Sequence, residues 1–268
     1  MRRIYIIFIT LVLLTFFAKP ILFAQLIQVC IDPGHGGPGA SKYGANGDGQ
    51  GTDGPLPSGQ KLSEEWVNLQ VALQLRDSID NFCGGNVSMT RTDETTSVTL
   101  AQRADSANFA DCDFDPRPEF CGADEFIPIH HNGLDPDSQG VETFWCNRAS
   151  VLINGQSYPR NITKMLAQKI FWRVTDKFTY PPYNPRRCDI ACYEVLRNTT
   201  MASCYSEATN MHNMDEAILF DDPSLAHVKD EAGAIYRGWR SYLLGDWYLC
   251  SRRHAGLPER KVAGGTLL

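Results

Sequence analysis

Val29-Cys-Ile-Asp-Pro-Gly-His-Gly-Gly37 is a short apolar run that stops at proline and glycine and then presents a histidine, His35. The run from Leu26 to Ile31 has the length and the β-branched content of a buried strand, and Pro33-Gly34 ends it. His35 is therefore expected just past the carboxyl end of a strand. In open α/β sheets ligands bind at that edge, because the loops that leave the strands converge there. A histidine flanked by glycines could approach a metal or a substrate closely.

Composition limits the fold and the partners. The chain has 268 residues, of which 43% are hydrophobic and 21% charged, and this fits one globular domain. The net charge of -6 and the pI near 5.5 provide no basic face for a phosphate backbone. We therefore expect no nucleic-acid partner.

The first 24 residues have the pattern of a secretory signal peptide. Met1 to Arg3 form a positive start, residues 4–18 are apolar, and Leu22 to Ala24 precede a cleavage point before Gln25. The alternative is an uncleaved anchor, but a Lys-Pro pair at 19 and 20 interrupts the run before it reaches the roughly 20 residues that a membrane span needs. We expect an exported protein, periplasmic or extracellular and associated with the cell envelope, without a stable membrane anchor. The tail from 251 to 268 is expected to be loosely ordered.

The nine cysteines are an odd number, so an exported chain would keep at least one free thiol. Cys30 and Cys204 lie in apolar runs and fit small core residues. No two CxxC pairs occur, which disfavours a four-cysteine zinc site. Spacing does not determine connectivity, but the pairs close enough to form local disulfides are Cys112 with Cys121 and Cys188 with Cys192.

Strands and helices alternate along the chain. We expect strands at 26–31, 87–91, 126–129, 140–146, 193–196 and 203–206, and helices at 63–79, 99–110, 162–174, 214–220 and 224–244. Residues 36–59 lack periodicity and predict a long surface loop that could act as a lid, and 180–187 predict an irregular connection. This order predicts a single α/β domain with a mixed, mostly parallel sheet of about six strands flanked by helices.

Four side chains from distant parts of the chain are predicted to meet at one edge of this sheet. They are His35, His130, Glu207 and a carboxylate at the start of the helix that Ser63 caps, Glu64 or Glu65. Two imidazoles and one carboxylate are a known catalytic zinc set that leaves a position open for water. A further carboxylate off the metal could move a proton from the water to a leaving amine.

Each of these residues also has an ordinary structural explanation. His35 could be a loop histidine, Glu64 could complement the helix dipole, and Glu207 could be a solvated carboxylate at a strand end. Of His130 and its neighbour His131, only one is expected to face a metal. The HExxH helix of common zinc peptidases is absent from the sequence.

From about residue 26 to 244 the chain resembles the zinc-dependent N-acetylmuramoyl-L-alanine amidases of the Amidase_3 type. Residues 29–37 resemble the family's opening strand and first zinc histidine, which implies His35 as a ligand. Glu64-Glu-Trp-Val-Asn-Leu69 is similar to the family's Glu-Lys-x-x-Asn-Leu, which implies Glu64 as the zinc carboxylate and Glu65 as a solvated neighbour. Pro128-Ile-His-His-Asn-Gly133 is similar to Ser-Ile-His-x-Asn-Ala, which implies His130 as the second zinc histidine.

The resemblance continues towards the end of the chain. Ser206-Glu207-Ala208 stands where the family has Val-Glu-Thr-Gly-Phe, which implies Glu207 as the catalytic carboxylate, and Asn213 and Glu216 match the Asn and Glu that follow. Two departures lie close to the implied site. Pro128 replaces the usual serine, and the residues after Glu207 lack the usual Gly-Phe.

The resemblance implies a zinc-dependent hydrolase that cleaves the amide between N-acetylmuramic acid and L-alanine in peptidoglycan. Residues 25–250 would form its catalytic domain, with Zn2+ as cofactor and the glycan strand and stem peptide as partners. Three alternatives remain from the residues themselves. They are a zinc peptidase or amidohydrolase acting on another amide, a wall-binding module without catalysis, and a hydrolase with Cys30 or Cys204 as nucleophile. Buried apolar thiols are poor thiolates, which disfavours the third.

Overall fold

A central sheet organises the chain. The computed structural model describes residues 27–44, 51–81, 85–110, 122–133, 135–148, 150–153, 156–159, 161–178 and 186–244. Seven strands of this part form one sheet, in the order β2-β1-β3-β9-β4-β7 with β8 also paired to β3. The pairs are parallel except for β4 with β9, which is antiparallel. The predicted mixed, mostly parallel sheet is confirmed, with seven strands among the described residues instead of about six.

The strands of the sheet are short and mostly buried. Their bounds are β1 (Ile27–Pro33), β2 (Gly85–Met89), β3 (Glu125–Asn132), β4 (Glu142–Trp145), β7 (Arg187–Ile190), β8 (Ala202–Ser203) and β9 (Tyr205–Asn210). A separate hairpin joins β5 (Ser150–Ile153) to β6 (Gln156–Pro159). In β1 every residue after the first is buried, as expected for a strand covered on both faces.

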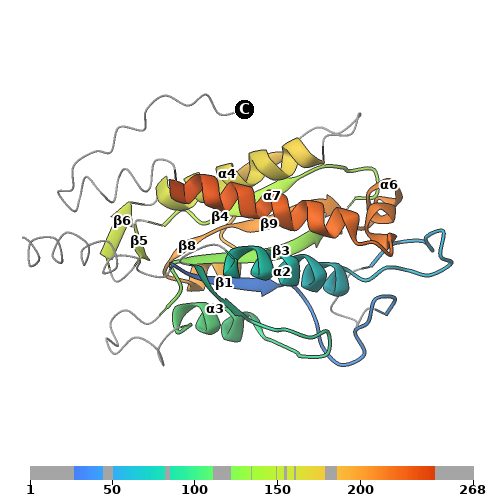
Figure 1. The fold of residues 1–268 in the computed structure, drawn as a ribbon, viewed down its shortest axis with the longest axis horizontal. Helices are drawn as coiled ribbons and strands as arrows, with labels where there is room; N and C mark the ends of the chain where they lie inside the picture. Colours follow the sequence, from blue (N-terminus) through green and yellow to red (C-terminus); the bar gives the residue numbers. More distant parts are fainter. Residues whose placement is uncertain are drawn as a thin grey trace, which may run out of the picture.

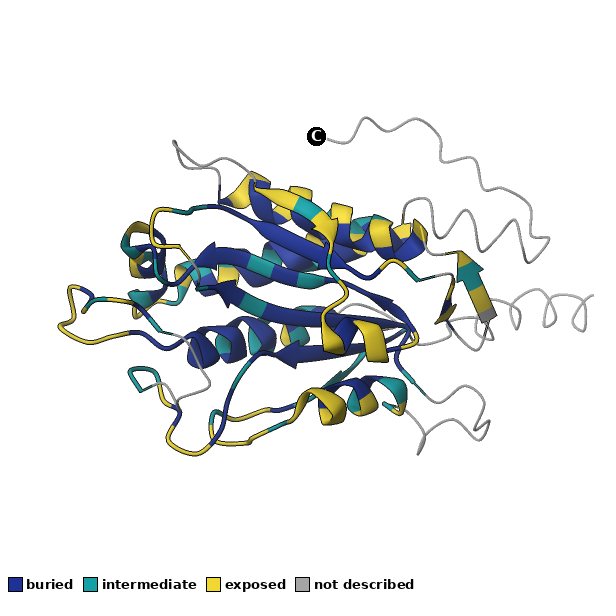
Figure 2. Cartoon of the chain, turned by 180° about the vertical axis from the view of Figure 1, so that it is seen from behind, coloured by how far each residue is buried: buried dark blue, intermediate teal, exposed yellow. Residues whose placement is uncertain are grey.

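Helices cover both faces of the sheet (Figures 1 and 2). One face carries the three long helices α2 (Glu64–Asp80), α4 (Asn161–Lys177) and α7 (Ala226–Tyr242), which enclose the larger hydrophobic cluster. The other face carries the shorter α3 (Leu100–Asn108) and α5 (Glu194–Asn198) over a smaller cluster. The short α6 (Met214–Ala217) and the 3-10 turn η3 (Ile218–Asp221) join β9 to α7. Two cores of unequal size therefore hold the sheet in place.

Local sequence signals set the starts of two helices. The Ser63 side chain accepts a hydrogen bond from the Trp66 backbone amide at 3.3 Å, as predicted for the N-cap of α2. Thr99 forms a capping box with Gln102 at the start of α3. Where α4 crosses α7, Gly238 is required, because an added Cβ would lie 2.6 Å from the Cα of Ile170. This close crossing fixes α7 against the sheet.

Three parts of the predicted secondary structure are wrong. Residues 193–196 form the start of helix α5 and not a strand, because a four-residue apolar run does not distinguish the two states. The edge strand β7 and the hairpin β5–β6 were not predicted. β7 is exposed or half-buried along its length and lacks an apolar alternation that would reveal it.

The segment between β1 and α2 is anchored along its described parts. Tyr43 donates a hydrogen bond to Asp221 at 2.9 Å, and Ser63 donates one to the backbone carbonyl of Ser41 at 2.7 Å. Leu56 and Thr52 are buried, so this segment is not only a surface loop as predicted. Its described residues therefore pack against the rest of the domain, next to the start of α2.

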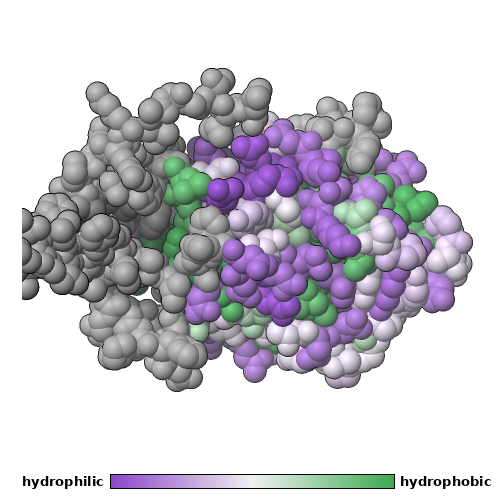
Figure 3. Space-filling view, viewed as in Figure 1, coloured by the Kyte–Doolittle hydropathy of each residue, from purple (hydrophilic) through white to green (hydrophobic). Residues whose placement is uncertain are grey.

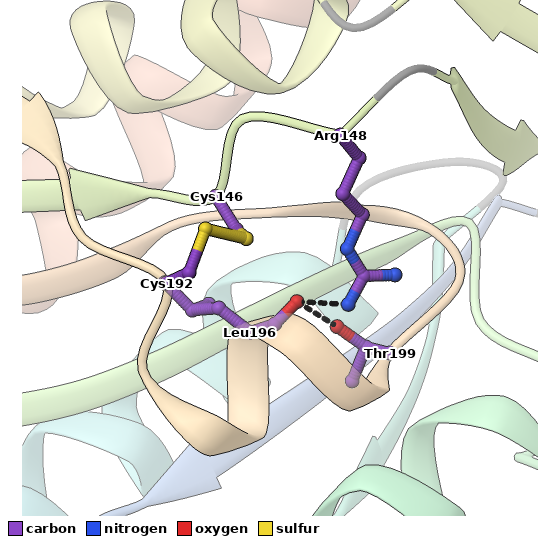
Figure 4. The surroundings of a disulfide bond; sticks show 5 residues. All are labelled: Cys146, Arg148, Cys192, Leu196 and Thr199. Atoms are coloured by element: carbon purple, nitrogen blue, oxygen red, sulfur yellow. Dashed lines mark hydrogen bonds between the residues drawn. A yellow bond between two sulfur atoms is a disulfide. The ribbon is translucent and has the colours of Figure 1, made fainter.

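One disulfide ties β4 to the start of α5 (Figure 4). Cys146 pairs with Cys192, so the predicted pair Cys188–Cys192 is wrong, and Cys188 is a half-buried free thiol. The close sequence spacing was misleading because Cys188 lies within β7, which pairs alongside β4 at Thr143. The other predicted pair, residues 112 and 121, lies outside the described residues. Cys30 and Cys204 are buried free thiols, as expected for core residues.

The surface over the three long helices is largely hydrophilic (Figure 3). No helix in the part of the chain that the structure describes is long and apolar enough to cross a membrane. The predicted signal peptide at 1–24 and the tail from 251 lie outside the described residues.

Candidate metal centre

The turn after β1 holds His35 in an unusual conformation. His35 has a left-handed backbone with φ of 58°, which non-glycine residues adopt rarely and often at functional sites. Arg103 donates hydrogen bonds from one Nη to the Pro33 carbonyl and from the other to the His35 carbonyl, both at 2.7 Å. Arg91 donates to the Pro33 and Gly34 carbonyls at 3.0 and 2.8 Å. Two buried guanidinium groups therefore fix the turn that presents His35.

His130 packs directly against this turn. A Cβ added to Gly34 would lie 2.1 Å from the His130 ring, so only glycine fits beneath the imidazole. The ring of Tyr205 stacks on the other side of His130, with centroids 4.4 Å apart and planes 16° from parallel. The His35 and His130 rings meet edge to face at 5.0 Å. The two imidazoles predicted from distant segments are thus neighbours.

Glu64 lies between the two histidines at the start of α2. Its Oε2 is 3.2 Å from His35 Nε2, and its Oε1 is 3.2 Å from His130 Nδ1. The backbone amide of His131 and the Asn68 side chain also donate to Oε1, at 3.1 and 3.2 Å. The carboxylate is buried and held at both oxygens.

These three residues fit a divalent metal. One ligand atom from each of His35, Glu64 and His130 lies within 4.8 Å of the others, and this is the one such group of metal-binding side chains among the described residues. Two imidazole nitrogens and one carboxylate oxygen are ligands that zinc accepts, and imidazole also suits other transition metals. The donor set alone does not identify the ion.

The three groups differ in how their environment shifts their pKa values. Burial alone would raise the pKa of Glu64, but His130 and His35 more than offset this and hold it far below its usual range. Burial lowers the pKa of His130 despite the adjacent Glu64, which favours the neutral imidazole that binds metals. The pKa of His35 is raised, because the interaction with Glu64 outweighs burial. A preformed anion thus faces two imidazoles.

Glu207 lies one strand away from this cluster. In the sheet register, His130 on β3 is opposite Glu207 on β9, and Glu207 is in turn opposite Glu142 on β4. Directly opposite residues point to the same face of a sheet, with Cβ atoms about 4.5–5.5 Å apart. Three chemically active side chains therefore form one row across three strands.

Burial and the neighbouring carboxylates make Glu207 a weaker acid than an ordinary glutamate. Burial, followed by the charges of Glu142 and Glu64, raises the pKa of Glu207 to about 8. Glu142 has its own partners, since its carboxylate accepts hydrogen bonds from Asn132 at 2.6 Å and from Arg187 at 2.7 Å. Glu207, with its raised pKa, can hold a proton near neutral pH, a property common in proton-transfer residues.

The row opens into two cavities that share His35 and His130. One, of about 410 Å³, extends towards α3 and α5, and the other, of about 370 Å³, contains Glu64, Glu142 and Glu207. Tyr193, Tyr205 and Leu100 line both cavities, and Leu100 is half-exposed. The disulfide at Cys192 fixes the residue next to Tyr193. The arrangement is a cleft with the candidate metal ligands in its middle.

Two residues matched by the resemblance, Glu216 and Asn213, make structural contacts. Glu216, matched by resemblance, accepts hydrogen bonds from the Gly140 and Asn210 backbone amides at 2.8 and 2.6 Å. Asn213 caps α6 and donates to the Pro136 carbonyl at 2.7 Å. Both residues hold the loop between β3 and β4 against the end of β9 and do not line either cavity.

One residue in the predicted site is placed wrongly, and others were missed. Glu65 is fully buried and not solvated, because the preceding segment folds back over the first turn of α2 and Arg91 donates to its backbone carbonyl at 2.7 Å. The roles of Arg91, Asn68 and Tyr205 were not predicted, since each acts through contacts made only in the folded chain. The Asn68 spacing of four from Glu64 was the available signal, because residues i and i+4 are neighbours on a helix.

The chain is similar to proteins of a known family. Residues 29–238 match the Amidase_3 family of N-acetylmuramoyl-L-alanine amidases. The chain is 28% identical over 193 residues to N-acetylmuramoyl-L-alanine amidase CwlM of Bacillus licheniformis, a match that covers 72% of this chain and 60% of CwlM. The chain therefore spans less than two thirds of the length of this curated relative.

Solved structures show the same fold. An N-acetylmuramoyl-L-alanine amidase from Clostridium difficile 630 superposes with a TM-score of 0.62 at 25% identity, covering 82% of this chain and 97% of that one. The catalytic domain of CwlV from Bacillus (Paenibacillus) polymyxa superposes with a TM-score of 0.59 at 23% identity, covering 81% and 98%. The family match extends over most of the chain, including His35, Glu64, His130 and Glu207. The chain belongs to the N-acetylmuramoyl-L-alanine amidase family of the Amidase_3 type.

Proposed function

We propose that this chain is a zinc-dependent hydrolase that cleaves the amide bond between N-acetylmuramic acid and L-alanine in peptidoglycan. The observation that carries the proposal is the cluster of His35, Glu64 and His130 in an open cleft, with Glu207 one strand away. Family membership supplies the substrate and the bond. A mechanism for this chain must assign a task to each of these four residues.

His35, Glu64 and His130 would hold Zn2+, and the ion would contribute Lewis acidity that polarises a carbonyl and makes water nucleophilic near neutral pH. Glu64 lies 3.2 Å from each of the two imidazoles. The turn that carries His35 is fixed by two arginines, and His130 is fixed between Gly34 and Tyr205. The ligands are therefore arranged by the fold, which reduces the cost of ordering them.

Glu207 would act as the general base and then the general acid. As a carboxylate it takes a proton from the attacking water, and as a carboxylic acid it donates that proton to the nitrogen of the leaving L-alanine. A carboxyl group whose pKa is raised towards the working pH can do both, and burial raises the pKa of Glu207. Burial and the adjacent Glu142 supply this shift.

The two cavities on either side of the histidines would receive the two halves of the substrate. The scissile amide then lies between them, next to His35 and His130, which line both. Tyr193 and Leu100 also line both cavities and offer apolar contact area. Such a two-armed cleft suits a bond that joins a sugar to a peptide.

The site of action follows from the substrate. We propose export by the segment 1–24, with residues 25–250 as the mature catalytic domain and 251–268 as a tail, so that the enzyme meets peptidoglycan in the cell envelope. The hydrophilic start and apolar core of the segment at 1–24 support this assignment.

The alternatives are disfavoured by specific observations. A binding module has no need for a metal triad beside a carboxyl group of raised pKa. A cysteine nucleophile is disfavoured because burial raises the pKa of the Cys30 thiol to about 12 and that of Cys204 well above its usual value. An amidohydrolase acting on a different amide is separated from the proposal only by its products.

Product analysis tests the proposal. Purified enzyme is incubated with peptidoglycan, and the released peptides are examined for a free L-alanine amino end and the glycan for a free lactyl carboxyl. We expect both products, loss of both on chelation and recovery with added zinc. The variant His130→Ala should be inactive, and His227→Ala, which removes a histidine outside the cleft, should be active. Peptides that begin with another residue, or activity that survives chelation, would contradict the proposal.

A further inference from the structure

A chain of buried hydrogen bonds connects the candidate metal carboxylate to the C-terminal helix. Asn68 Nδ2 donates to Glu64 Oε1 at 3.2 Å, Asn68 Oδ1 is 2.7 Å from His131 Nδ1, and His131 Nε2 is 3.0 Å from Glu231 Oε2. These residues come from α2, β3 and α7. The network therefore ties three elements of the larger core to one oxygen of the metal site.

The direction of each hydrogen bond follows from the available donors. Asn68 uses its amide NH₂ for Glu64 and for the Gly34 carbonyl at 3.3 Å, so its oxygen is left to accept from His131 Nδ1. The other ring nitrogen, Nε2, lies 3.0 Å from Glu231 Oε2. Each ring nitrogen of His131 therefore has a hydrogen-bonding partner, and the orientation of the ring is fixed at both ends.

The network is sealed from solvent. The side chains of His131 and Glu231 are 0% exposed, and Asn68 is fully buried as well. The Phe220 ring packs edge to face against His131 at 5.0 Å and removes its remaining freedom. Inside a protein hydrogen bonds are stronger than in water, and a buried imidazole nitrogen that lost its partner would be left unsatisfied.

The network acts on the metal site at two points. Through Asn68 it supplies a donor to Glu64 Oε1, and through the backbone amide of His131 it supplies a second donor to the same oxygen at 3.1 Å. His131 is also the residue next to His130, so fixing its ring fixes the strand that carries a candidate ligand. Hydrogen bonds to metal-binding carboxylates orient them and affect metal affinity.

We propose that Glu231 and His131 are positioning residues that hold Glu64, through Asn68 and the β3 backbone, in the orientation that binds the metal. This inference rests on the proposed metal centre. It assigns a role in metal affinity to α7, whose residue Glu231 lines neither cavity of the cleft.

Zinc affinity measured by competition with a chromophoric chelator tests the proposal. Glu231→Gln keeps the size of the side chain but removes its charge. His131→Asn keeps a donor for Asn68 and removes the link to Glu231. We expect both variants to bind zinc at least about tenfold more weakly, as is typical of lost partners of metal ligands. Excess zinc should restore most of their turnover, because neither change touches Glu207.

The matched control is Glu125→Gln. Glu125 is also a fully buried carboxyl group, at the opposite end of β3 and outside the network. Its zinc affinity should equal that of the wild type. A loss of affinity in Glu125→Gln as large as in Glu231→Gln would show a general effect of core damage and would overturn the proposal.

Two further results keep the outcome decisive. Circular dichroism and cooperative thermal unfolding of the metal-free variants establish that they fold. Slow solvent exchange of the Asn68 side-chain amide protons in the wild type, followed by NMR, tests the buried network without any variant. Folded variants with wild-type zinc affinity, or Asn68 amide protons that exchange rapidly, would overturn the positioning role. If the wild type is active and binds zinc, and these variants bind zinc equally well, only the positioning role fails and the proposed function is unaffected. A wild type without zinc affinity overturns both.

Discussion

The two ends of β3 place carboxyl groups in opposite surroundings. At the end where the site lies, Glu64 is buried among two imidazoles, a backbone amide and the Asn68 side chain, and its pKa is held far below the usual range. At the other end, Glu125 is equally buried, and burial followed by the charge of Asp124 raises its pKa well above the usual value. Burial is the same in both places. The hydrogen-bond donors and charges around each carboxyl group therefore determine whether its pKa is lowered or raised.

Glu207 lies between these extremes and shows why the difference matters for function. It is opposite His130 in the sheet register on one side and opposite another carboxylate, Glu142, on the other. Burial, followed by the charge of Glu142, raises its pKa to about 8, within reach of neutral pH. A permanently charged Glu64 suits metal binding, and a carboxyl group that gains and loses a proton suits proton transfer.

The largest expected effect is the loss of zinc when Glu64, the charged member of this comparison, is neutralised. Glu64→Gln removes the anion that faces His35 and His130, so the variant should retain no stoichiometric zinc, where the wild type should carry about one ion per chain. Elemental analysis after dialysis measures this. Glu125→Gln is the matched control and should keep its zinc. Equal zinc contents in the two variants would remove Glu64 from the metal site.

The next effect concerns a third buried carboxylate, Asp32 at the end of β1. Asp32 depends on an ion pair with Arg103 and a hydrogen bond from Thr90 at 2.5 Å. Arg103→Leu should lower the free energy of unfolding by about 3–5 kcal/mol, because it leaves a buried charge without its cation. Urea denaturation checks this against Arg76→Leu, which removes the surface pair with Asp77 and should cost less than about 1 kcal/mol. Similar losses in both variants would contradict the role of donors at buried carboxylates.

The third prediction concerns pH and Glu207 in the metal-free protein. A carboxyl group with a raised pKa binds more protons in the folded than in the unfolded state, so folding stability decreases as pH rises from about 4.5 to about 8. Glu207→Gln should remove this part of the pH dependence, on the order of a few kcal/mol over the whole range. Urea titrations of both proteins at a series of pH values measure it. Parallel curves for wild type and variant would refute the raised pKa.

The smallest expected effect is a pKa change at Asp93, where hydrogen-bond donors act on a carboxylate that is not buried. Asp93 is exposed, yet hydrogen bonds from Thr96 and Thr95 lower its pKa to about 2. At pH values above the unfolded pKa of 3.8, these hydrogen bonds to the charged Asp93 stabilise the turn. This stabilisation is lost as the pH falls to about 2. Carbon NMR of the Asp93 carboxyl should give this midpoint, and Thr96→Val should move it towards 3.8. An unchanged midpoint in Thr96→Val would show that another group causes the shift.

The fold was predictable where local pattern and tertiary structure agree. The β-branched run at 26–31 ends at Pro33-Gly34, which favoured a buried strand, and Ser63 and Thr99 signal helix starts that the structure confirms. The errors lie where pattern is weak. The edge strand β7 has no buried face, and the four residues at 193–196 are too few to show a period.

The candidate site was only partly predictable. His35 follows the end of β1, Glu64 starts α2, His130 lies near the end of β3 and Glu207 lies within β9 instead of at its end. The sheet brings these side chains close together, as expected. The residues that hold them could not be predicted, because their partners are far apart in sequence. His131 and Glu231 are 100 residues apart, and Arg103 and His35 are 68 apart. Such contacts depend on how helices pack over the sheet.

The central claim is that Glu64 and Glu207 divide the work between metal binding and proton transfer. The most direct test measures zinc content and peptide release from peptidoglycan in wild type and Glu207→Gln side by side. The division of roles predicts that Glu207→Gln keeps about one zinc ion per chain and loses peptide release, because an amide cannot accept the proton. A Glu207→Gln variant that releases peptides at the wild-type rate, or that loses its zinc, would contradict this division.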